Sequence, residues 1–404
     1  MSTAKPIPYG RQSVSEQDIQ AVVDVLRSDF LTQGPVVPAF ETRVANYCHA
    51  KHGVAVNSAT SALHIACLAL DLGPGDWLWT SPNTFVASAN CALYCGAQVD
   101  FVDINPRTYN LCPIKLEQKL HAAEKLGKLP KIVVPVHFAG QSCDMVAIHA
   151  LSLKFGFKII EDASHAIGAS YRQAPVGNGS FSDITVFSFH PVKIITSAEG
   201  GMAVTNDARL ATRMKKLRSH GITSDPFELE ARPEAEIWNY QQKELGLNYR
   251  MTELQAALGL SQMDRLDAFV ARRRLLAQRY DDKLQGLGLV TPQQSTEGLS
   301  AYHLYPVCVD THATGVKQKD LYKHLIAQGI VVNVHYIPVY LQPFFRRLGF
   351  VRGYCPNAEN YYQHCLSIPM YSALSVQQQN SVVSKLKRGL QQLESSQTVH
   401  KELA

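Results

Sequence analysis

The segment VFSFHPVKIITSAEGG, residues 186–201, places a single lysine, Lys193, among apolar side chains. A charged amine is costly to bury, and apolar surroundings lower its affinity for protons. A neutral amine can attack a carbonyl carbon and form a Schiff base, so Lys193 is a candidate nucleophile. The alternative is a lysine that packs its methylene stem against apolar residues and extends its ammonium group to solvent.

The segment KIIEDASHA carries an acid and a histidine at the end of an apolar run, Asp162 and His165. A carboxylate at this position can hold a protonated ring nitrogen through a charge-assisted hydrogen bond, worth roughly 1.5–3 kcal/mol. His165 could reach a neighbouring oxygen. A helix-capping aspartate and a core histidine are the alternative, and the segment alone leaves both interpretations open.

The segment NSATSALH joins a short apolar run to a helical pattern through the small residues Ser58, Ala59 and Thr60. Small side chains let backbone N–H groups approach an anion, and a helix N-terminus adds positive potential, so a phosphate would fit here. An ordinary helix cap would have the same residues. Ser188, in FSFHP, could donate to the same phosphate.

The segment TSPNTFVASAN offers Phe85, which could lie flat against a planar ring, although a core phenylalanine has the same pattern. Phosphate site, aromatic ring, carboxylate and lysine thus follow one another along the chain. Together they describe a pocket for pyridoxal phosphate. In that pocket Asp162 keeps the pyridine nitrogen protonated and Lys193 holds the aldehyde carbon.

The elements that must position these groups are short β-rich runs that alternate with helical runs between residues 52 and 205. This alternation predicts a parallel sheet covered by helices, in which ligands bind at the carboxyl ends of the strands. A helical pattern from Thr252 to Leu284 leads out of this domain. YHLYPVCV and IVVNVHYIPVY are predicted strands of a smaller α+β domain. We therefore expect a large domain with an N-terminal arm, residues 1–265, and a small C-terminal domain, residues 266–404.

Composition agrees with a two-domain protein, because 404 residues with 46% hydrophobic content exceed the usual size of one core. The formal charge of +5 is too mild to indicate nucleic acid as a partner. The 9 cysteines show neither a disulfide framework nor a metal-binding spacing, so no metal is expected. No signal peptide or membrane span is visible, which predicts a cytoplasmic protein that does not bind membranes.

The chain resembles the DegT/DnrJ-type sugar aminotransferases, which are fold-type I pyridoxal phosphate enzymes. The segments that carry the resemblance follow the family's order: FLTQGP, NSATSALH, PNTFVASAN, IEDASHAIGA, FSFHPVKIITSAEGG and LGLNYRMTELQAALG. The resemblance implies an α/β fold, with a large domain built on a mostly parallel seven-stranded sheet and a smaller α+β C-terminal domain. It also implies a homodimer whose active sites lie at the subunit interface, each completed by the partner chain.

The same resemblance assigns roles to individual positions. Lys193 becomes the catalytic Schiff-base lysine, Asp162 the partner of the pyridine nitrogen, and His165 the partner of the cofactor's ring oxygen. Phe85 becomes the residue that stacks on the ring. Phosphate contacts fall to Ser58, Ala59, Thr60 and Ser188, and to Asn248, which would reach in from the other subunit.

Within the family, SDFLTQGP, FSFHPVK and VHYIPVY look most like the aminotransferases of pseudaminic acid synthesis. This likeness implies transfer of an amino group from L-glutamate to carbon 4 of a UDP-linked 4-keto-6-deoxy-N-acetylamino sugar. Arg250 would bind either the donor's carboxylate or the partner subunit. The sugar nucleotide would contact Tyr9, Phe30, Leu31, His335 and Tyr336.

Four other functions are weighed against this one. A related enzyme could act on a dTDP- or GDP-linked 4-keto-6-deoxy sugar. A sugar dehydratase of the same family would carry histidine in place of Lys193, so the lysine disfavours it. A cofactor-binding sensor lacks support because no DNA-binding helix pair or basic arm precedes the domain, and a dehydrogenase lacks support because no G-x-G-x-x-G segment follows a strand.

Overall fold

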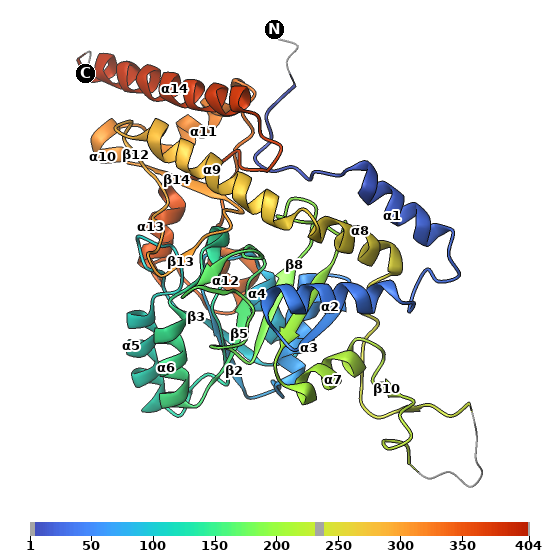
Figure 1. Cartoon of the computed structure of the whole chain (residues 1–404). Helices are drawn as coiled ribbons and strands as arrows, with labels where there is room; N and C mark the ends of the chain where they lie inside the picture. Colours follow the sequence, from blue (N-terminus) through green and yellow to red (C-terminus); the bar gives the residue numbers. More distant parts are fainter. Residues whose placement is uncertain (1–4, 231–237, 403–404) are drawn as a thin grey trace.

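The computed structural model describes residues 5–230 and 238–402, and a seven-stranded sheet of order β1-β9-β8-β5-β4-β2-β3 lies at its centre (Figure 1). Every strand runs in the same direction except β9, which is antiparallel to both of its neighbours. The predicted mostly parallel seven-stranded sheet is confirmed. Its strands are β1 (His52–Val56), β2 (Trp77–Thr80), β3 (Gln98–Phe101), β4 (Ile132–Val134), β5 (Lys158–Asp162), β8 (Ile184–Ser188) and β9 (Gly201–Thr205).

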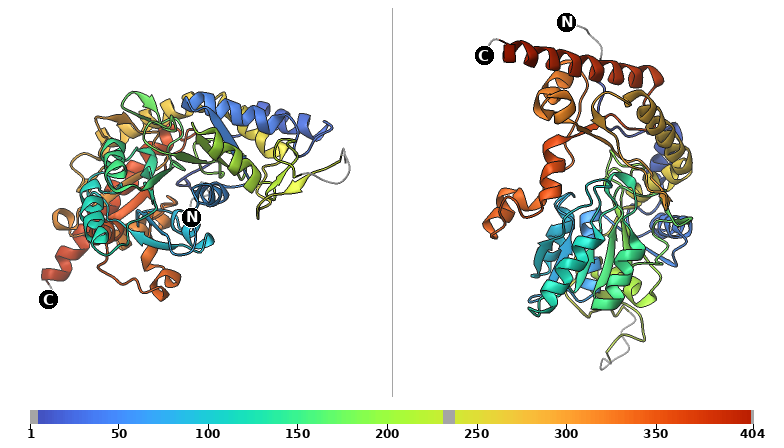
Figure 2. Two further views of the ribbon diagram at one scale, coloured as in Figure 1. Left: turned by 90° about the horizontal axis from the view of Figure 1, so that it is seen from below. Right: turned by 90° about the vertical axis from the view of Figure 1, so that its left-hand side faces the viewer.

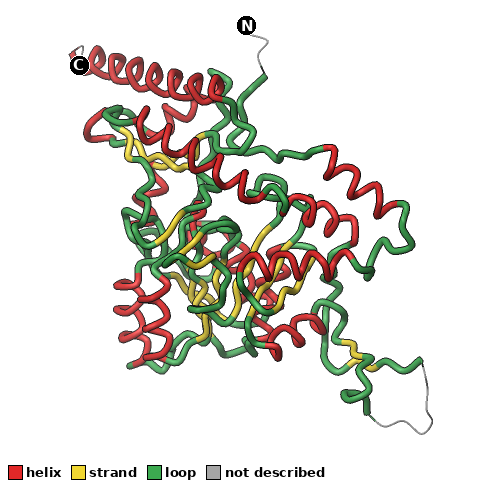
Figure 3. Tube along the Cα trace, viewed as in Figure 1, coloured by secondary structure: helices red, strands yellow, loops and turns green. Residues whose placement is uncertain are grey.

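Helices cover both faces of this sheet, as the tube in Figure 3 shows. Val54 and Val56 of β1 pack on one face with Leu63 of α3, whereas Ala55 packs on the other face with Phe40 of α2. Because both faces are covered, the strands are apolar along their length and do not alternate with polar residues. The first face carries α3 (Ala59–Ala69), α4 (Ala87–Tyr94) and α7 (Ala208–Leu217); the second carries α2 (Val36–Cys48), α5 (Pro113–Glu124), α6 (Met145–Phe155) and α8 (Glu253–Met263).

The N-terminal helix α1 (Glu16–Leu26) begins directly after Ser15. Ser15 is its N-cap and accepts a hydrogen bond from the backbone N–H of Asp18, while the Asp18 side chain accepts one from the N–H of Ser15. Two otherwise unpaired backbone groups are satisfied by this capping box. Helix α1 then packs against α8, so the N-terminal arm lies on the sheet domain.

The predicted continuous helix from Thr252 to Leu284 is wrong, because the chain forms two helices, α8 and α9 (Leu266–Leu284). Arg265, between them, has φ −110° and ψ 2°, outside the α-helical range. Its guanidinium forms an ion pair with the buried carboxylate of Asp18. This long-range contact holds the chain where it changes direction. Hydrophobic periodicity cannot predict such a contact, because Asp18 and Arg265 are far apart in the sequence.

A second core lies above the sheet domain in the right-hand view of Figure 2 and contains a three-stranded antiparallel sheet. Tyr305 and Val307 face this core, whereas Cys308 faces the core of the sheet domain. Since Ile7 also lies in the second core, the N-terminal arm contributes to both parts. The boundary after residue 265 stays a prediction. The elements are β12 (Leu289–Val290), β14 (Tyr305–Val309), β15 (Cys365–Ile368), α9, α11 (Gln318–Ala327) and α14 (Val376–Glu402).

The predicted strand IVVNVHYIPVY, residues 330–340, is also wrong. Only Ile330 and Asn333 form isolated bridges, to Ile7 and Ser367. The backbone N–H of Tyr336 instead donates to Asn83 Oδ1 of the sheet domain, at 3.1 Å. The segment therefore satisfies its backbone by crossing between the two parts of the molecule.

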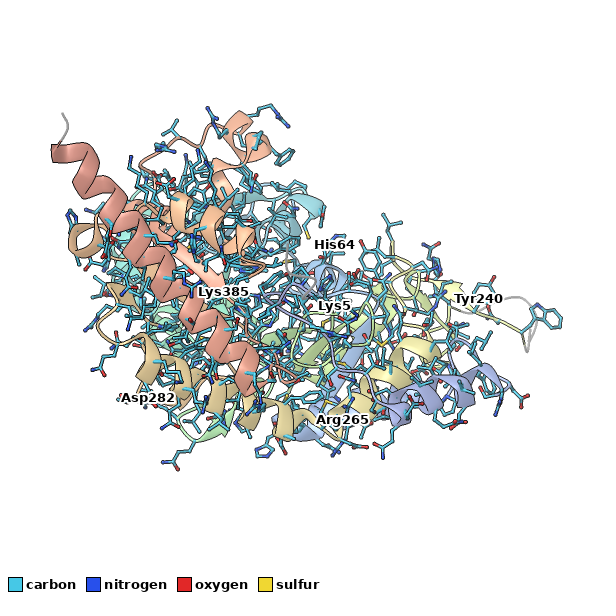
Figure 4. The ribbon with its side chains drawn as sticks, turned by 90° about the horizontal axis from the view of Figure 1, so that it is seen from above. Lys5, His64, Tyr240, Arg265, Asp282 and Lys385 are labelled. Atoms are coloured by element: carbon cyan, nitrogen blue, oxygen red, sulfur yellow. The ribbon has the colours of Figure 1, made fainter. Side chains whose placement is uncertain are left out.

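The remaining elements are short. Between β10 and β11 an arm projects from the sheet domain, and it carries the exposed side chains of Phe227, Trp238 and Tyr240. In Figure 4, Tyr240 lies far from Asp282 and Lys385 of the second part. In the part of the chain that the structure describes, no helix is long and apolar enough to cross a membrane. The short elements are β6 (Ser170–Tyr171), β7 (Ala174–Pro175), β10 (Ile222–Thr223), β11 (Gln241–Gln242), β13 (Gly298–Leu299), α10 (Thr311–Thr314), α12 (Pro343–Arg347), α13 (Pro356–His364), and the 3₁₀ turns η1 (Phe138–Gly140) and η2 (Val339–Leu341).

Candidate active site

A cavity of about 970 Å³ opens at the carboxyl ends of β1, β5 and β8, where ligands are expected in an open α/β sheet. On the side of the second core, the cavity is lined by His303 and by residues 333–337 of the segment that crosses between the two parts of the molecule, here called the crossing segment. The structure therefore brings together most of the residues that the sequence singles out. These are Tyr9, Ser58, Ala59, Thr60, Phe85, Asp162, His165, Ser188, Lys193, His335 and Tyr336.

The N-terminus of α3 forms one end of the cavity. Ser58 is the N-cap, and its Oγ accepts a hydrogen bond from the Ser61 N–H at 3.1 Å. Ser61 Oγ in turn donates to Asn57 Oδ1 at 2.6 Å. The first backbone N–H groups of a helix have no partner within it, so Ala59 and Thr60 can present theirs to an anion in the cavity.

Gly201, at the start of β9, allows this helix end to approach the sheet. A Cβ atom added at Gly201 would lie 2.5 Å from the backbone nitrogen of Ala59 and 2.5 Å from the carbonyl carbon of Ser58. Real Cβ atoms do not come this close to backbone atoms. Glycine at this position is therefore required for the strand and the helix N-terminus to form a cradle for a phosphate-sized anion.

Asp162, the last residue of β5, points into the cavity and is 4% exposed. Its Oδ2 accepts a hydrogen bond from Ser88 Oγ at 2.6 Å, and its Oδ1 accepts one from the Ser164 N–H at 3.1 Å. Each carboxylate oxygen has a further lone pair, so the group can still accept a hydrogen bond from a ligand. The carboxylate is thus held in one orientation by two neighbours.

Lys193 lies in the loop between β8 and β9, half-buried in the same cavity. Burial lowers the pKa of its amine to about 8, although the negative charge of Asp162 opposes the shift. A large fraction of the amine is therefore neutral near pH 8. The carboxylate and the amine lie close enough for the charge of one to act on the other, as the predicted pocket requires.

His165 is buried beside Lys193, and its tautomer can be inferred from its contacts. Its Nδ1 accepts a hydrogen bond from the Ala139 N–H at 3.2 Å, so the proton lies on Nε2, 3.2 Å from Tyr336 Oη. Burial, together with Lys193 and His335, lowers the pKa of His165 well below its ordinary value. The ring is therefore a neutral hydrogen-bond donor at the wall of the cavity.

The opposite wall contains two more neutral histidines. Burial and the charge of Lys193 lower the pKa of His335 to about 3, and its Nδ1 lies 2.8 Å from Ser367 Oγ. His303 is 4% exposed, with its ring centroid 4.4 Å from that of His165. Within the described residues, His303 Nδ1 is buried without a hydrogen-bond partner. A buried donor or acceptor of this kind is available to a ligand.

A second polar network lies behind the cavity, on the other side of β5. Glu161 is bound by His137 Nε2 at 2.6 Å, Ser182 Oγ at 2.5 Å and Thr185 Oγ1 at 3.2 Å. Burial acts to raise the pKa of Glu161, but these hydrogen bonds outweigh it and lower the pKa. The network joins the segment after β4, strand β5 and the start of β8, so it holds the strand that carries Asp162.

Four of the predicted site residues lie outside the cavity. Phe30 and Leu31 are 52% and 50% exposed, and the Leu31 carbonyl accepts a hydrogen bond from the Glu253 N–H at 3.0 Å. Asn248 is exposed and Arg250 is half-buried, and both lie in the segment that leads to helix α8. The structure therefore does not bring these four side chains to the site of their own chain.

Sequence reasoning missed Ser88, His303 and Asn333. Ser88 follows Phe85 by one helical turn, and that spacing was the only available signal for it. His303 lies within the predicted strand YHLYPVCV, where a histidine has many structural roles. Asn333 lies in the segment predicted as a strand, and that prediction gave no reason to expect it at the cavity wall.

The arrangement fits a cofactor that combines a phosphate, a carbonyl group and a basic ring nitrogen. The helix N-terminus with Ser58 and Ser188 suits the phosphate, Asp162 suits the ring nitrogen, and Lys193 suits the carbonyl carbon. Phe85, at the cavity, is 60% exposed and leaves one side of its ring available for stacking. These are the groups of pyridoxal phosphate.

The chain belongs to the DegT/DnrJ/EryC1/StrS aminotransferase family, whose sequence profile matches residues 12–387. It is a sugar aminotransferase with the α/β fold of the pyridoxal phosphate-dependent enzymes of this family, and its cofactor is pyridoxal phosphate. The fold, enzyme class and cofactor predicted from the sequence are therefore confirmed.

Particular relatives are similar along nearly the whole chain. The spore coat polysaccharide biosynthesis protein SpsC of Bacillus subtilis is 38% identical over 384 residues, which cover 94% of this chain and 96% of that protein. The UDP-4-amino-4,6-dideoxy-N-acetyl-beta-L-altrosamine transaminase of Campylobacter jejuni is 36% identical over 397 residues, covering 95% and 99%. The structure of PseC of Helicobacter pylori, an aminotransferase of pseudaminic acid biosynthesis, superposes with a TM-score of 0.87 at 29% identity, covering 96% and 100%.

Proposed function

We propose that the enzyme transfers an amino group from L-glutamate to carbon 4 of a UDP-linked 4-keto-6-deoxy-N-acetylamino sugar, in a pathway of the pseudaminic acid type. The observation that carries the proposal is the cavity in which Lys193, Asp162 and the N-terminus of α3 meet. The similarity to the Campylobacter jejuni transaminase supports the choice of sugar and nucleotide. Transfer to a dTDP- or GDP-linked 4-keto-6-deoxy sugar is the second candidate.

When bound, pyridoxal phosphate supplies a carbonyl that condenses with amines and a ring that withdraws electrons from the neighbouring carbon. The Nζ atom of Lys193 would take a proton from the α-carbon of the donor and pass it on, and the lowered pKa of its amine, about 8, suits a group that both accepts and donates a proton. Asp162 would accept a hydrogen bond from the N–H of the ring and so keep the ring nitrogen protonated. In the second half of the reaction, with the keto sugar, Lys193 moves the proton in the opposite direction.

The uncharged wall suits the sugar. His303, His335 and Tyr336 offer donors and acceptors without a net charge, since burial keeps both histidines neutral. Hydroxyl and amide groups of a sugar bind to such neutral partners. A substrate that cannot form a hydrogen bond with the unpaired, buried Nδ1 of His303 should bind less tightly. Arg250 lies outside the cavity of its own chain, so its carboxylate-binding role requires the partner subunit.

The test is turnover of purified, cofactor-loaded protein with L-glutamate and a panel of UDP-, dTDP- and GDP-linked 4-keto sugars. We expect release of 2-oxoglutarate with the UDP-linked N-acetylamino sugar, and at least about tenfold lower kcat/KM with the other nucleotides, equivalent to one lost hydrogen bond. Preference for a dTDP or GDP sugar would replace the first candidate with the second. Elimination of water without use of glutamate would instead identify a dehydratase.

We also propose that the enzyme is a cytoplasmic homodimer with shared active sites. The positions of Phe30, Leu31 and Asn248 outside their own cavity, together with the exposed aromatic side chains of the β10–β11 arm, support this arrangement. Co-expression of Lys193→Ala with Asn248→Ala is the test. One intact site per mixed dimer should restore about a quarter of wild-type activity, whereas either variant alone should have little. Absence of any restoration would contradict shared sites.

A further inference from the structure

Helix α9 passes from the core of the sheet domain to the second core, and a buried arginine lies at the crossing (Figure 1). The first half of the helix packs in the sheet domain through Phe269 and Val270, and the second half packs in the second core through Leu276 and Tyr280. Arg273, between these halves, is 1% exposed. A charge at this depth is costly unless polar groups surround it, so its contacts indicate its role.

Arg273 is bound by backbone carbonyl groups and not by a carboxylate. Its Nη1 donates to the carbonyl oxygens of Tyr302 and His303, both at 3.2 Å, and to that of Met370 at 3.0 Å. Burial lowers the pKa of the guanidinium to about 10, so the group is still charged at neutral pH. Among the residues that the structure describes, no carboxylate forms an ion pair with it. The charge is therefore stabilised by the dipoles of two separate backbone segments.

Both backbone segments lead to the active-site cavity. His303 lines the cavity directly. The Met370 N–H donates to the carbonyl oxygen of Tyr9 at 2.9 Å, and Tyr9 lines the same cavity, with its ring centroid 5.3 Å from that of His335. The hydrogen bonds of Arg273 therefore lie directly behind the cavity wall that presents the neutral histidines.

The turn that presents His303 has a strained backbone. Tyr302 has φ +46°, in the left-handed region that bulky side chains rarely adopt. On one side the turn is tied to η1, because the Ala301 N–H donates to the Gly140 carbonyl at 3.0 Å. On the other side Arg273 binds the carbonyls of Tyr302 and His303. A strained conformation persists only where its surroundings hold it, and Arg273 supplies the contacts on the side of α9.

The positive charge of Arg273 also acts on the ring of His303. Burial is the largest cause that lowers the pKa of His303 well below its ordinary value, and the other causes are the nearby groups of His165, Lys193, Arg273 and His335. The ring is therefore neutral, with one nitrogen as a donor and the other as an acceptor. Arg273 thus acts on both the position and the charge state of the residue whose Nδ1 is buried without a partner in the described part of the chain.

We infer that Arg273 is a positioning residue for the amino acceptor, which holds the turn at Tyr302 so that the ring of His303 faces the keto sugar. Arg273 itself does not line the cavity and acts through His303. This inference rests on the proposed function, because it takes His303 to contact the sugar. The competing role for Arg273 is purely structural, in which it only joins the two cores, and the tests below separate the two roles.

The first test is steady-state kinetics of Arg273→Met, with Arg272→Met as the matched control. Arg272 precedes it on α9 and donates to the carbonyl of Leu374 at 2.8 Å, and Leu374 does not line the cavity. Arg273→Met should raise KM for the sugar nucleotide about tenfold, because His303 loses its fixed position, while the half-reaction with glutamate stays within about threefold. Arg272→Met should leave both within about twofold. Equal losses in the two half-reactions of Arg273→Met would overturn the inference.

The second test asks whether Arg273 acts through His303. Arg273→Met is combined with His303→Leu, and KM should then exceed that of His303→Leu alone by no more than about 1.5-fold, because the ring that Arg273 positions is already absent. Effects that multiply would show that Arg273 does not act through His303 and would overturn the inference. If Arg273→Met does not fold, Arg273→Gln, which keeps an N–H donor without the charge, replaces it in both tests.

The conservative variant Arg273→Lys should restore much of the loss. All three hydrogen bonds of Arg273 come from one nitrogen, and an ammonium group has three N–H donors. We expect KM about threefold above wild type, since lysine keeps the charge but lacks the rigid guanidinium plane. Retained visible absorbance of bound pyridoxal phosphate in each variant shows that a change in KM does not come from misfolding.

A third measurement separates this inference from the proposed function, because it needs no substrate. NMR signals of the histidine ring nitrogens are compared in cofactor-loaded wild type and variants, and His303→Leu identifies those of His303. They should move in Arg273→Met and stay in place in Arg272→Met. If they stay in place in both, Arg273 does not position His303, whichever sugar the enzyme uses. If they move but wild-type protein aminates no UDP-linked keto sugar, the proposed substrate is wrong and the positioning of His303 by Arg273 still holds.

Discussion

The active-site cavity has two walls that are built in different ways. One wall comes from the central sheet and presents charged groups, Asp162 and Lys193, at strand ends and in the loop after β8. The other wall comes from His303 and the crossing segment, and the histidines it presents are kept neutral by burial. A strand end positions Asp162 and the loop between two strands positions Lys193, whereas individual side-chain contacts position the neutral wall.

This difference indicates a division of tasks. Proton transfer and the stabilisation of charge need groups held rigidly near opposite charge, which the sheet provides. Discrimination between sugars needs unpaired donors and acceptors at chosen positions, which irregular backbone can present more freely. Changes to the charged wall should therefore affect both half-reactions, and changes to the neutral wall should mainly affect the sugar and the pH dependence of stability.

The largest effect is expected from Lys193→Ala, on the charged wall. Removal of the amine deletes both the covalent partner and the proton carrier, so turnover should fall by about 10⁴-fold or more. The visible absorbance of the cofactor bound to the lysine should also disappear. The measurement is an absorbance spectrum followed by an assay of 2-oxoglutarate. Persistence of both signals would reject the role of Lys193.

A smaller effect is expected from Asp162→Asn. Loss of the buried negative charge should reduce turnover in both half-reactions by about 10²–10³-fold, the cost of breaking a buried charge pair. Ser88→Ala removes only the 2.6 Å hydrogen bond to Asp162 and should cost about tenfold or less. Because the charge of Asp162 raises the pKa of Lys193, Asp162→Asn should lower that pKa below about 8.

Stopped-flow absorbance of cofactor-free protein mixed with pyridoxal phosphate measures this pKa. The neutral amine reacts, so the rate should rise with pH around a midpoint of about 8 in wild type and around a lower midpoint in Asp162→Asn. Unchanged midpoints would show that the two groups do not interact. An equal loss in Ser88→Ala and Asp162→Asn would show that orientation, and not charge, is what matters.

The smallest effect concerns the neutral wall and the stability of the protein. His335 binds no proton in the folded state until the pH reaches about 3, whereas an unfolded histidine binds one below its ordinary pKa of about 6.5. Since the unfolded state binds more protons in this window, the free energy of unfolding falls as the pH falls from about 6.5 toward 3. This loss is about 1.4 kcal/mol per pH unit for one such group.

His335→Gln should therefore reduce the loss of stability between pH 7.5 and pH 5.5 by about 1 kcal/mol. Urea unfolding of the cofactor-free wild type and variant at these two pH values measures the difference. His121→Gln, which alters an exposed histidine on α5, is the control and should leave the pH dependence close to wild type. The same pH dependence in all three proteins would mean that burial of His335 is not linked to folding.

The amount that could be predicted from the sequence differs between the two walls. The strands of the sheet and the helices that cover it have local apolar patterns. These patterns predict that Asp162 lies at a strand end and that Lys193 follows the next strand of the chain. The segment around His335 has the composition of a strand, yet it forms a crossing loop whose contacts include the hydrogen bonds from Tyr336 to Asn83 and from Tyr361 to His335. No local pattern encodes a contact between residues 253 positions apart in the chain.

The sequence by itself determined the parallel sheet, the helix N-terminus that suits a phosphate, and the lysine and acid that suit the cofactor. These features depend on hydrophobic periodicity and on the spacing of residues that are close together in the sequence, and both can be read without the fold. Only the tertiary structure decided the break between α8 and α9, the hydrogen bond from Ser88 to Asp162 and the unpaired nitrogen of His303. Each of these depends on packing between distant segments, where burial, and not the residue type alone, sets the chemistry.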